Sequence, residues 1–230
     1  MKKFLKLISY FHFKRIHYFK TTVFDIVKFN RVTFCFLTLI TVFSIHARVG
    51  EEKSALEIRL FRGGGIQYKK EQAIDRLQKG MPYLKFEKYF PSSCIVRLYF
   101  KTLDGRRPKP SEVENPQNLE GWDVHVIYYK EISMLEIYEK NQPISEFEMI
   151  HLLNLQSGDS FWQKTKLNDP EEKVPASSFG FDMIRDDQKI RAKRINASTL
   201  MFFSTDFDEG LARAKKDDLE EKAPYSVYGF

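Results

Sequence analysis

A short apolar run directly behind a basic segment sets the first 47 residues apart from the rest of the chain. Residues 32–45 carry no charged side chain, whereas residues 1–31 carry eight Lys or Arg and one acid, Asp25. The 14 uncharged residues would form a helix about 21 Å long, too short for the roughly 30 Å hydrocarbon layer of a membrane. A basic flank, a short apolar core and a small residue after it make up an export signal. We therefore expect residues 1–47 to be a signal peptide.

The end of the apolar run indicates where this signal is cut. Ala47 is a suitable small residue, so we expect cleavage between Ala47 and Arg48, although Ile45 is bulkier than the usual residue at its position. The alternative is an uncleaved form held in the inner membrane by its N-terminus. Cys35 stands at the beginning of the apolar core, where it cannot serve as a lipoprotein cysteine. The long basic flank is either a membrane-surface segment or a sign that translation starts near Val27.

Charge is distributed unevenly, and this changes the expected class of partner. The whole chain has a net charge of +6, but residues 48–230 hold 29 basic and 30 acidic side chains. The basic character therefore belongs to the leader, and we expect no nucleic-acid partner and no membrane contact beyond the leader. The mature protein is expected in the periplasm or outside the cell. Its single cysteine, Cys94, cannot form an intramolecular disulfide and is interpreted as a buried, inert thiol.

Alternation of apolar and polar side chains predicts an antiparallel sheet in the mature chain. Period-two patterns rich in β-branched and aromatic residues are typical of strands that are buried on one side. The expected strands are 83–90, 94–102, 122–130, 134–139, 179–185, 190–195 and 199–204. Between the second and third of them, residues 103–121 contain three prolines and predict a long solvated loop.

Helical periodicity and end signals predict the remaining elements. The expected helices are 51–61, 69–79, 145–156 and a last one from 206 through 216. Gly63, Gly64 and Gly65 should end the first helix, because glycine adopts the left-handed conformation without a Cβ clash. Ser145 and Glu148 have the spacing of a capping box. The third helix is expected to bury a stripe of Phe147, Ile150 and Leu153, widened by Met149 and Leu152, with Trp162 packed over it.

These elements predict an α+β fold with short helices packed on an antiparallel sheet. Residues 48–140 and 141–205 each begin with a helix and continue with strands, so we expect two halves of similar outline without a sequence repeat. Their combined length suits one domain with a sizeable core, or two small ones that share a sheet. Residues 206–230 form a charged C-terminal tail that is expected to fray near 225–230.

Two histidine–carboxylate pairs are the strongest candidates for chemistry. His125 stands two residues after Asp123 on one strand face and could act as an oriented base or metal ligand, but a metal site needs three or four protein ligands. His151 follows Glu148 by three residues, a spacing seen in di-iron bundles, which use several such helices. We interpret both as structural, and we predict no catalytic residue, no metal and no cofactor.

Two charged clusters also have simple structural interpretations. Lys189, Arg191 and Lys193 fall on one strand face, where they could contact an anionic surface. An edge strand protected from aggregation is the favoured explanation. Asp206 and Asp208 resemble part of a calcium loop but lack its other ligands, so a solvated helix start is expected.

A resemblance adds to this reading of the residues. The segments that carry it are Ala47-Arg48-Val49-Gly50-Glu51, Gly65-Ile66-x-Tyr68, Ile144-Ser145, Leu152-Leu153 and Trp162. In this order they resemble a group of uncharacterised exported bacterial proteins that begin Ala-Arg-Ile/Val-Gly-Glu after their signal peptide. The order of helix and antiparallel strands is also similar to small outer-membrane assembly lipoproteins of the SmpA/OmlA (BamE-like) type, whose lipobox cysteine this chain lacks. The group has no established activity, so the resemblance implies no site residues.

The sequence thus favours a non-catalytic interaction module of the bacterial envelope whose partner is another envelope protein. The alternative is a periplasmic or secreted hydrolase, or an enzyme that binds a small ligand, with a site dispersed along the chain. A cleft lined by Asp123, His125 and a neighbouring acid would favour the enzyme. A smooth sheet with an exposed aromatic patch would favour the interaction module.

Overall fold

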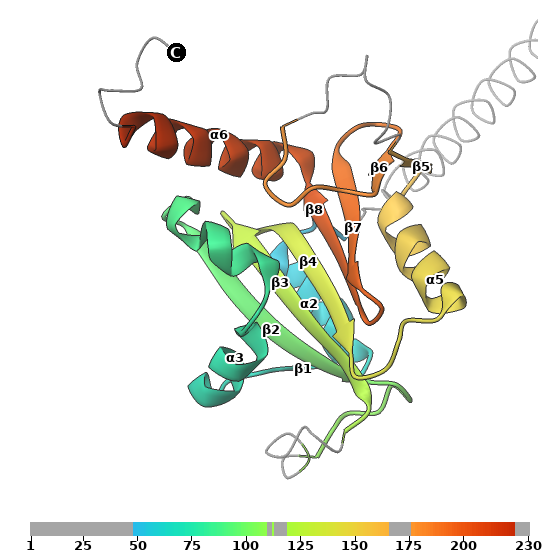
Figure 1. The fold of residues 1–230 in the computed structure, drawn as a ribbon. Coiled ribbons are helices and arrows are strands. Elements are labelled where there is room, and N and C mark those ends of the chain that lie inside the picture. Colours follow the sequence, from blue (N-terminus) through green and yellow to red (C-terminus); the bar gives the residue numbers. More distant parts are fainter. Residues whose placement is uncertain (1–47, 110–111, 113–118, 166–175, 224–230) are drawn as a thin grey trace, which may run out of the picture. The chain divides into compact units, whose positions relative to one another are not determined.

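The computed structural model describes residues 48–109, 112, 119–165 and 176–223. They form an eight-stranded antiparallel sheet with helices on both faces (Figure 1), which confirms the α+β prediction. Within the described part of the chain, no helix is long and apolar enough to span a bilayer. The predicted signal peptide and Ala47 lie outside the described residues.

The order of the strands joins the two predicted halves into one sheet. Along the chain the strands are β1 (Ile66–Gln67), β2 (Cys94–Thr102), β3 (Gly121–Tyr129), β4 (Ile132–Lys140), β5 (Trp162–Lys164), β6 (Met183–Arg185), β7 (Ile190–Asn196) and β8 (Thr199–Ser204). In the sheet they follow the order β1-β2-β3-β4-β8-β7-β6-β5. The last strand of one half therefore pairs with the last strand of the other, with Ile137 opposite Met201.

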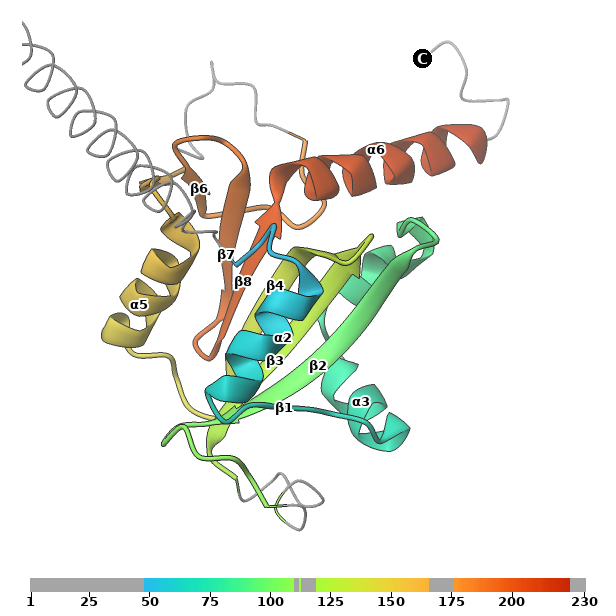
Figure 2. The ribbon, with the colours of Figure 1, turned by 180° about the vertical axis from the view of Figure 1, so that it is seen from behind.

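Each face of the sheet is covered by its own set of helices. On one face lie α2 (Lys53–Arg62) and α5 (Glu146–Ser157), and on the other lie α3 (Glu71–Gln78), the 3₁₀-helix η1 (Pro82–Tyr89) and α6 (Thr205–Glu221). Figure 2 shows α2 in front of β2 and β3. Apolar side chains at alternate positions of a strand point to opposite faces of the sheet, and each face has its own core. We call the α2 and α5 side the open face and the η1 and α6 side the closed face.

Several local predictions are confirmed. Strands β2 and β8 have the predicted bounds, and α2 ends at the glycines. Gly64 has φ +83°, and a Cβ there would lie 2.1 Å from the Gly105 carbonyl oxygen, so only glycine fits. The Ser145 side chain accepts a hydrogen bond from the Glu148 backbone N–H, and the Glu148 carboxylate accepts one in return from the Ser145 N–H, which completes the capping box. Trp162 donates its indole N–H to the Leu153 carbonyl and so packs against α5, as expected.

The strand predicted over 83–90 is wrong, because this segment forms η1. Pro82 occupies the first turn, where its missing N–H is tolerated. The buried side chains are Tyr83 and Phe86, which are three residues apart. In a 3₁₀-helix residues i and i+3 share a face, so the burial follows a period of three and the apparent alternation of period two is incidental.

The buried face predicted for α5 is right on one side and wrong on the other. Leu152 is buried, and Met149 and Leu153 pack against the core, as predicted. Phe147 is 86% exposed and Ile150 is exposed as well, and Gln156 is buried in their place. Gln156 is drawn inward by two buried hydrogen bonds, from the Val49 N–H to its side-chain oxygen and from its amide to Glu136. A buried polar residue with satisfied partners has therefore set the orientation of the helix.

The second half departs from prediction at its ends. The strand expected over 179–185 is only β6, since Gly180 has φ +66° and breaks the extended run. β5 was not expected, and α6 continues past residue 216 to Glu221. The fraying predicted near 225–230 concerns residues outside the described part of the chain.

The two charged clusters, on β7 and at the start of α6, were predicted to be exposed to solvent. This prediction is wrong for one residue of each, because Arg191 and Asp208 form a buried ion pair. β7 lies between β6 and β8, so it is not an edge strand. Its Arg191 is 1% exposed and donates to the fully buried Asp208 at 2.7 Å. Asp208 also accepts hydrogen bonds from the Ser177 hydroxyl and from the Ser178 and Phe179 backbone N–H groups. Asp208 therefore anchors the loop before β6 to the start of α6.

Candidate functional site

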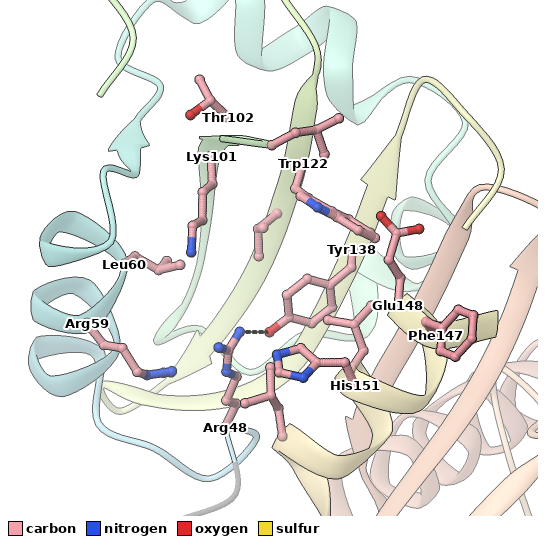
Figure 3. A pocket seen from close by; sticks show the side chains of 14 residues that line it. Arg48, Arg59, Leu60, Lys101, Thr102, Trp122, Tyr138, Phe147, Glu148 and His151 are labelled. Atoms are coloured by element: carbon pink, nitrogen blue, oxygen red, sulfur yellow. Dashed lines mark hydrogen bonds between the residues drawn. The ribbon is translucent and has the colours of Figure 1, made fainter. Parts of the chain in front are cut away.

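A pocket of about 400 Å³ opens on the open face between α2 and α5, above strands β2, β3 and β4 (Figure 3). Its volume lies in the lower part of the range of roughly 300–1,000 Å³ that is typical of ligand sites. It is lined by Arg48, Arg59, Leu60, Lys101, Thr102, Leu103, Trp122, Val124, Tyr138, Phe147, Glu148, His151, Leu152 and Leu155. The lining thus combines cationic side chains with aromatic and aliphatic ones.

The segment that precedes α2 places Arg48 in the pocket. The Val49 N–H donates to the Gln156 side-chain oxygen at 3.0 Å, and the Gly50 N–H donates to the Ser133 carbonyl at 2.7 Å. With its neighbours fixed in this way, Arg48 donates to the Tyr138 hydroxyl at 3.1 Å (Figure 3). The predicted first residue of the mature chain is therefore part of the pocket.

A buried carboxylate lies directly below this arginine. Glu136 is fully buried and accepts hydrogen bonds from the Ser133 hydroxyl at 2.9 Å, the Gln156 amide at 3.0 Å and the Tyr138 hydroxyl. Because Tyr138 accepts from Arg48 and donates to Glu136, its hydroxyl links the two charges. This chain of hydrogen bonds fixes the floor of the pocket.

Two more cations approach the pocket beside α2. Figure 3 shows the side chains of Arg59, Lys101 and Arg48 directed toward the same space. Arg59 forms an ion pair with Glu51. Lys101 has no ion pair or hydrogen bond within the described residues, and its Nζ lies near the end of α2, where a Cβ on Gly63 would be 3.2 Å away. The α2 side of the pocket is consequently its positive side.

The opposite wall, on α5, carries an acid that is already occupied. Glu148 accepts two hydrogen bonds from the Lys140 ammonium, at 2.9 and 3.2 Å, and others from Ser145. Burial acts to raise the pKa of Glu148, but Lys140 and Ser145 hold that pKa below its usual value. The Lys140 ammonium also lies 5.3 Å from the centre of the Trp122 ring. Glu148 is therefore ionised and committed within the protein.

The two histidine–carboxylate pairs noted in the sequence have different positions. Glu148 and His151 both line the pocket, and His151 is exposed. Asp123 and His125 lie on the closed face, where Asp123 accepts from the Tyr68 hydroxyl at 2.8 Å and His125 shares a hydrogen bond of 3.1 Å with Tyr83. The structure shows no hydrogen bond between Asp123 and His125, so it does not bring them together as a pair.

Burial shifts the pKa values of several groups that lie outside the pocket. It raises the pKa of Asp123 to about 6, against the effect of the Tyr68 hydrogen bond, and lowers the pKa of His125 to about 4. Burial also raises the pKa of the Cys94 thiol, which disfavours the reactive thiolate. Across the described ranges, no group of three or more His, Cys, Asp or Glu side chains could hold a metal ion.

Sequence reasoning missed most of the pocket. From the sequence, Arg48 was noted at the cleavage position and in the segment that carries the resemblance, and Lys101 and Trp122 only as members of strands. The sequence did contain one signal, because alternation places Lys101 on the same strand face as Tyr99. In the structure, Lys101 is the register partner of Trp122. That signal gave no indication that α2 and α5 would stand on either side of these residues.

Comparisons of the chain with models of protein families, with curated proteins and with solved structures find no match. The site is therefore described from the residues of this chain alone. What it offers chemically is a hollow with cations on one side, aromatic and aliphatic groups beside them, and a rim that includes the exposed Phe147.

Proposed function

We propose that this chain is an exported, non-catalytic binding module of the bacterial envelope, with the pocket between α2 and α5 as its ligand site. The observation that carries the proposal is the pocket itself, in which cationic side chains from three separate segments are directed into an apolar hollow (Figure 3). Concave, mostly apolar sites with a few converging polar groups are the usual form of ligand pockets.

Glu148, the acid that lines the pocket, is already bound by Lys140 and Ser145, and this supports binding over catalysis. General acid–base chemistry needs a titratable group that can exchange a proton with the substrate, whereas Glu148 is held by Lys140 and Ser145. His151, the other titratable candidate, has no hydrogen-bond partner within the described residues that would orient its ring. A histidine base is ordinarily oriented by a second group. Neither side chain has the supporting contacts that catalysis requires.

The enzyme alternative gains no support from the first histidine–carboxylate pair. A hydrolase built on Asp123 and His125 would need them beside a cleft. Both face the side of the sheet opposite to the pocket, and each is bonded to a different tyrosine, Tyr68 or Tyr83.

The ligand site can be tested with one tryptophan as a reporter. The chain has two tryptophans, and Trp122 lines the pocket whereas Trp162 packs on α5. In the Trp162→Phe variant, a small-molecule library should yield compounds that change the fluorescence of Trp122. The Trp122→Phe variant, which keeps Trp162, is the matched control. A library that produced no response specific to Trp122 would argue against this site.

Export is tested separately by locating the protein and sequencing its N-terminus. We expect the protein in the envelope or medium, beginning at Arg48. Recovery of the uncleaved chain as a soluble cytosolic protein would refute the proposed compartment, and uncleaved chain in the inner membrane would indicate the anchored form instead.

A further inference from the structure

We propose that the pocket binds an amphipathic organic anion, with its charged group among Arg48, Arg59 and Lys101 and its apolar body toward α5. This inference rests on the proposed function, because it takes the pocket as the ligand site and adds the chemical class of the ligand. Carboxylates and phosphate monoesters share the required chemistry.

The pocket has more cations than acids available to balance them. Glu51 pairs with Arg59, and Glu148 on the far wall is used by Lys140. Lys101 has no such partner in the described structure, and a lysine ammonium has three donors to satisfy. The positive side of the pocket is therefore left with unused donors.

Arg48 adds to this excess, because it contacts the buried carboxylate of Glu136 only through the neutral Tyr138 hydroxyl. The Tyr138 hydroxyl stands between Arg48 and Glu136 in the chain of hydrogen bonds. An arginine has five N–H donors, and the structure records one side-chain hydrogen bond from Arg48, to Tyr138. Guanidinium groups bind carboxylate and phosphate through two parallel hydrogen bonds, so Arg48 retains the donors that such a ligand needs.

An anion that enters the pocket would be attracted by all three of these cations. The attraction is stronger beside a partly apolar lining, where less water screens the charges. Binding of the anion should therefore be weakened by salt and by removal of any one cation.

Part of the pocket lining is apolar, which favours a ligand with an apolar body. Leu60, Val124, Leu152 and Leu155 line the pocket together with the Trp122 ring. An inorganic anion would leave these groups in contact with water, whereas a ligand with an apolar body would bury them at a gain of roughly 25 cal/mol per Å². A charge and an apolar body in one small molecule satisfy both sides of the pocket.

The inference is tested with four probes on the full chain carrying Trp162→Phe. Decanoate and decyl phosphate have both parts, decanol has the apolar body alone, and acetate has the charge alone. Titrations followed by Trp122 fluorescence should give affinities for decanoate or decyl phosphate at least about tenfold higher than for decanol or acetate, as expected for one charge-assisted interaction. The stronger of the two anions identifies the charged group.

A matched pair of lysine variants locates the charge. Lys101→Met keeps the length of the side chain and should weaken decanoate binding about tenfold while leaving decanol unchanged. Lys85 is exposed on η1, on the closed face, so Lys85→Met should change neither affinity. Unfolding curves of both variants verify that they fold like the parent protein.

The outcomes separate this inference from the proposed function. Equal affinity for decanoate and decanol would overturn the charge assignment while the pocket remained a ligand site. A site that ignored all four probes but bound neutral or cationic library compounds would overturn the inference and leave the proposed function standing. If no compound of any class affected Trp122, both would fall.

Discussion

Among the residues that the structure describes, each face of the sheet contains one fully buried carboxylate, and the two are balanced in different ways. On the closed face Asp208 meets the Arg191 guanidinium directly at 2.7 Å. On the open face Glu136 receives only neutral donors, and Arg48 lies one hydroxyl further away, at the pocket. A carboxylate that is neutralised by direct contact anchors the fold. One whose countercharge is displaced toward solvent leaves a cation available to a ligand.

The surroundings of the two carboxylates differ as well, since Asp208 is enclosed by protein and Glu136 lies next to a pocket. Asp208 is enclosed by the Ser177 hydroxyl and the backbone N–H groups of Ser178 and Phe179. The apolar core beside it includes Phe179, Phe203 and Phe207. Glu136 lies beneath a pocket that opens between two helices. The closed face therefore holds its buried charge for stability, and the open face is the one for which we propose ligand binding.

The largest effect is expected from the closed face. Asp208→Asn keeps the shape of the side chain but leaves Arg191, which is 1% exposed, without its buried countercharge. Loss of one member of a buried pair costs about 3–5 kcal/mol, which should appear as a lower free energy of unfolding in urea. Glu209→Gln, at the partly exposed second partner of Arg191, should cost about 1 kcal/mol or less. Equal losses in the two variants would contradict the anchoring role of Asp208.

A smaller effect is expected at the link on the open face. Tyr138→Phe removes the hydroxyl that joins Arg48 to Glu136 and should lower the free energy of unfolding by about 1–3 kcal/mol, since a buried carboxylate loses a donor. Tyr89→Phe is the matched control, because its hydroxyl donates to Asp218, which keeps Lys88 and Lys222 as partners. We expect this control to lose less. A loss as large as that of Tyr138→Phe would show that Glu136 depends little on the link.

Asp123 and His125 on the closed face should both contribute to the pH dependence of folding. Asp123 has a pKa raised to about 6, so the stability contributed by its protonated form is present below about pH 4 and lost as pH rises through 6. His125 has a pKa lowered to about 4, so its contribution is present above about pH 6.5 and lost as pH falls through 4. The two act in opposite directions over this range.

Single variants should expose the two contributions. Relative to the parent protein, Asp123→Asn should make the free energy of unfolding rise more steeply between pH 4 and 6, and His125→Gln should make it rise less or fall. Each difference should amount to about 1–2 kcal/mol across the range. Urea denaturation at several pH values measures it, and parallel curves for all three proteins would contradict the assignment.

The smallest effect is expected at the rim of the pocket. Phe147 is 86% exposed, so Phe147→Ala should change the free energy of unfolding by no more than about 0.5 kcal/mol. Leu152→Ala, on the buried side of the same helix, is the control and should cost about 2–5 kcal/mol. A loss for Phe147→Ala as large as that for Leu152→Ala would contradict the exposed position of Phe147.

The elements predicted best from the sequence are those whose burial depends on apolar side chains alone. Strand β8 has the expected bounds because its apolar, β-rich run is buried almost throughout. The capping box at Ser145 was predictable because both of its partners lie within one turn. Two of the errors concern polar residues. Gln156 and Asp208 are buried because their partners, Glu136 and Arg191, are brought to them from distant positions.

The sequence by itself determined the α+β class and most of the strands, because periodicity of two or 3.6 residues is a local property of the chain. Tertiary structure decided which charges are buried and where the pocket lies. Arg48, Lys101 and Tyr138 meet only because the sheet order and the placement of α2 and α5 bring distant segments together. A local pattern shows whether a side chain is polar, but its hydrogen-bond or ion-pair partner depends on how distant segments pack.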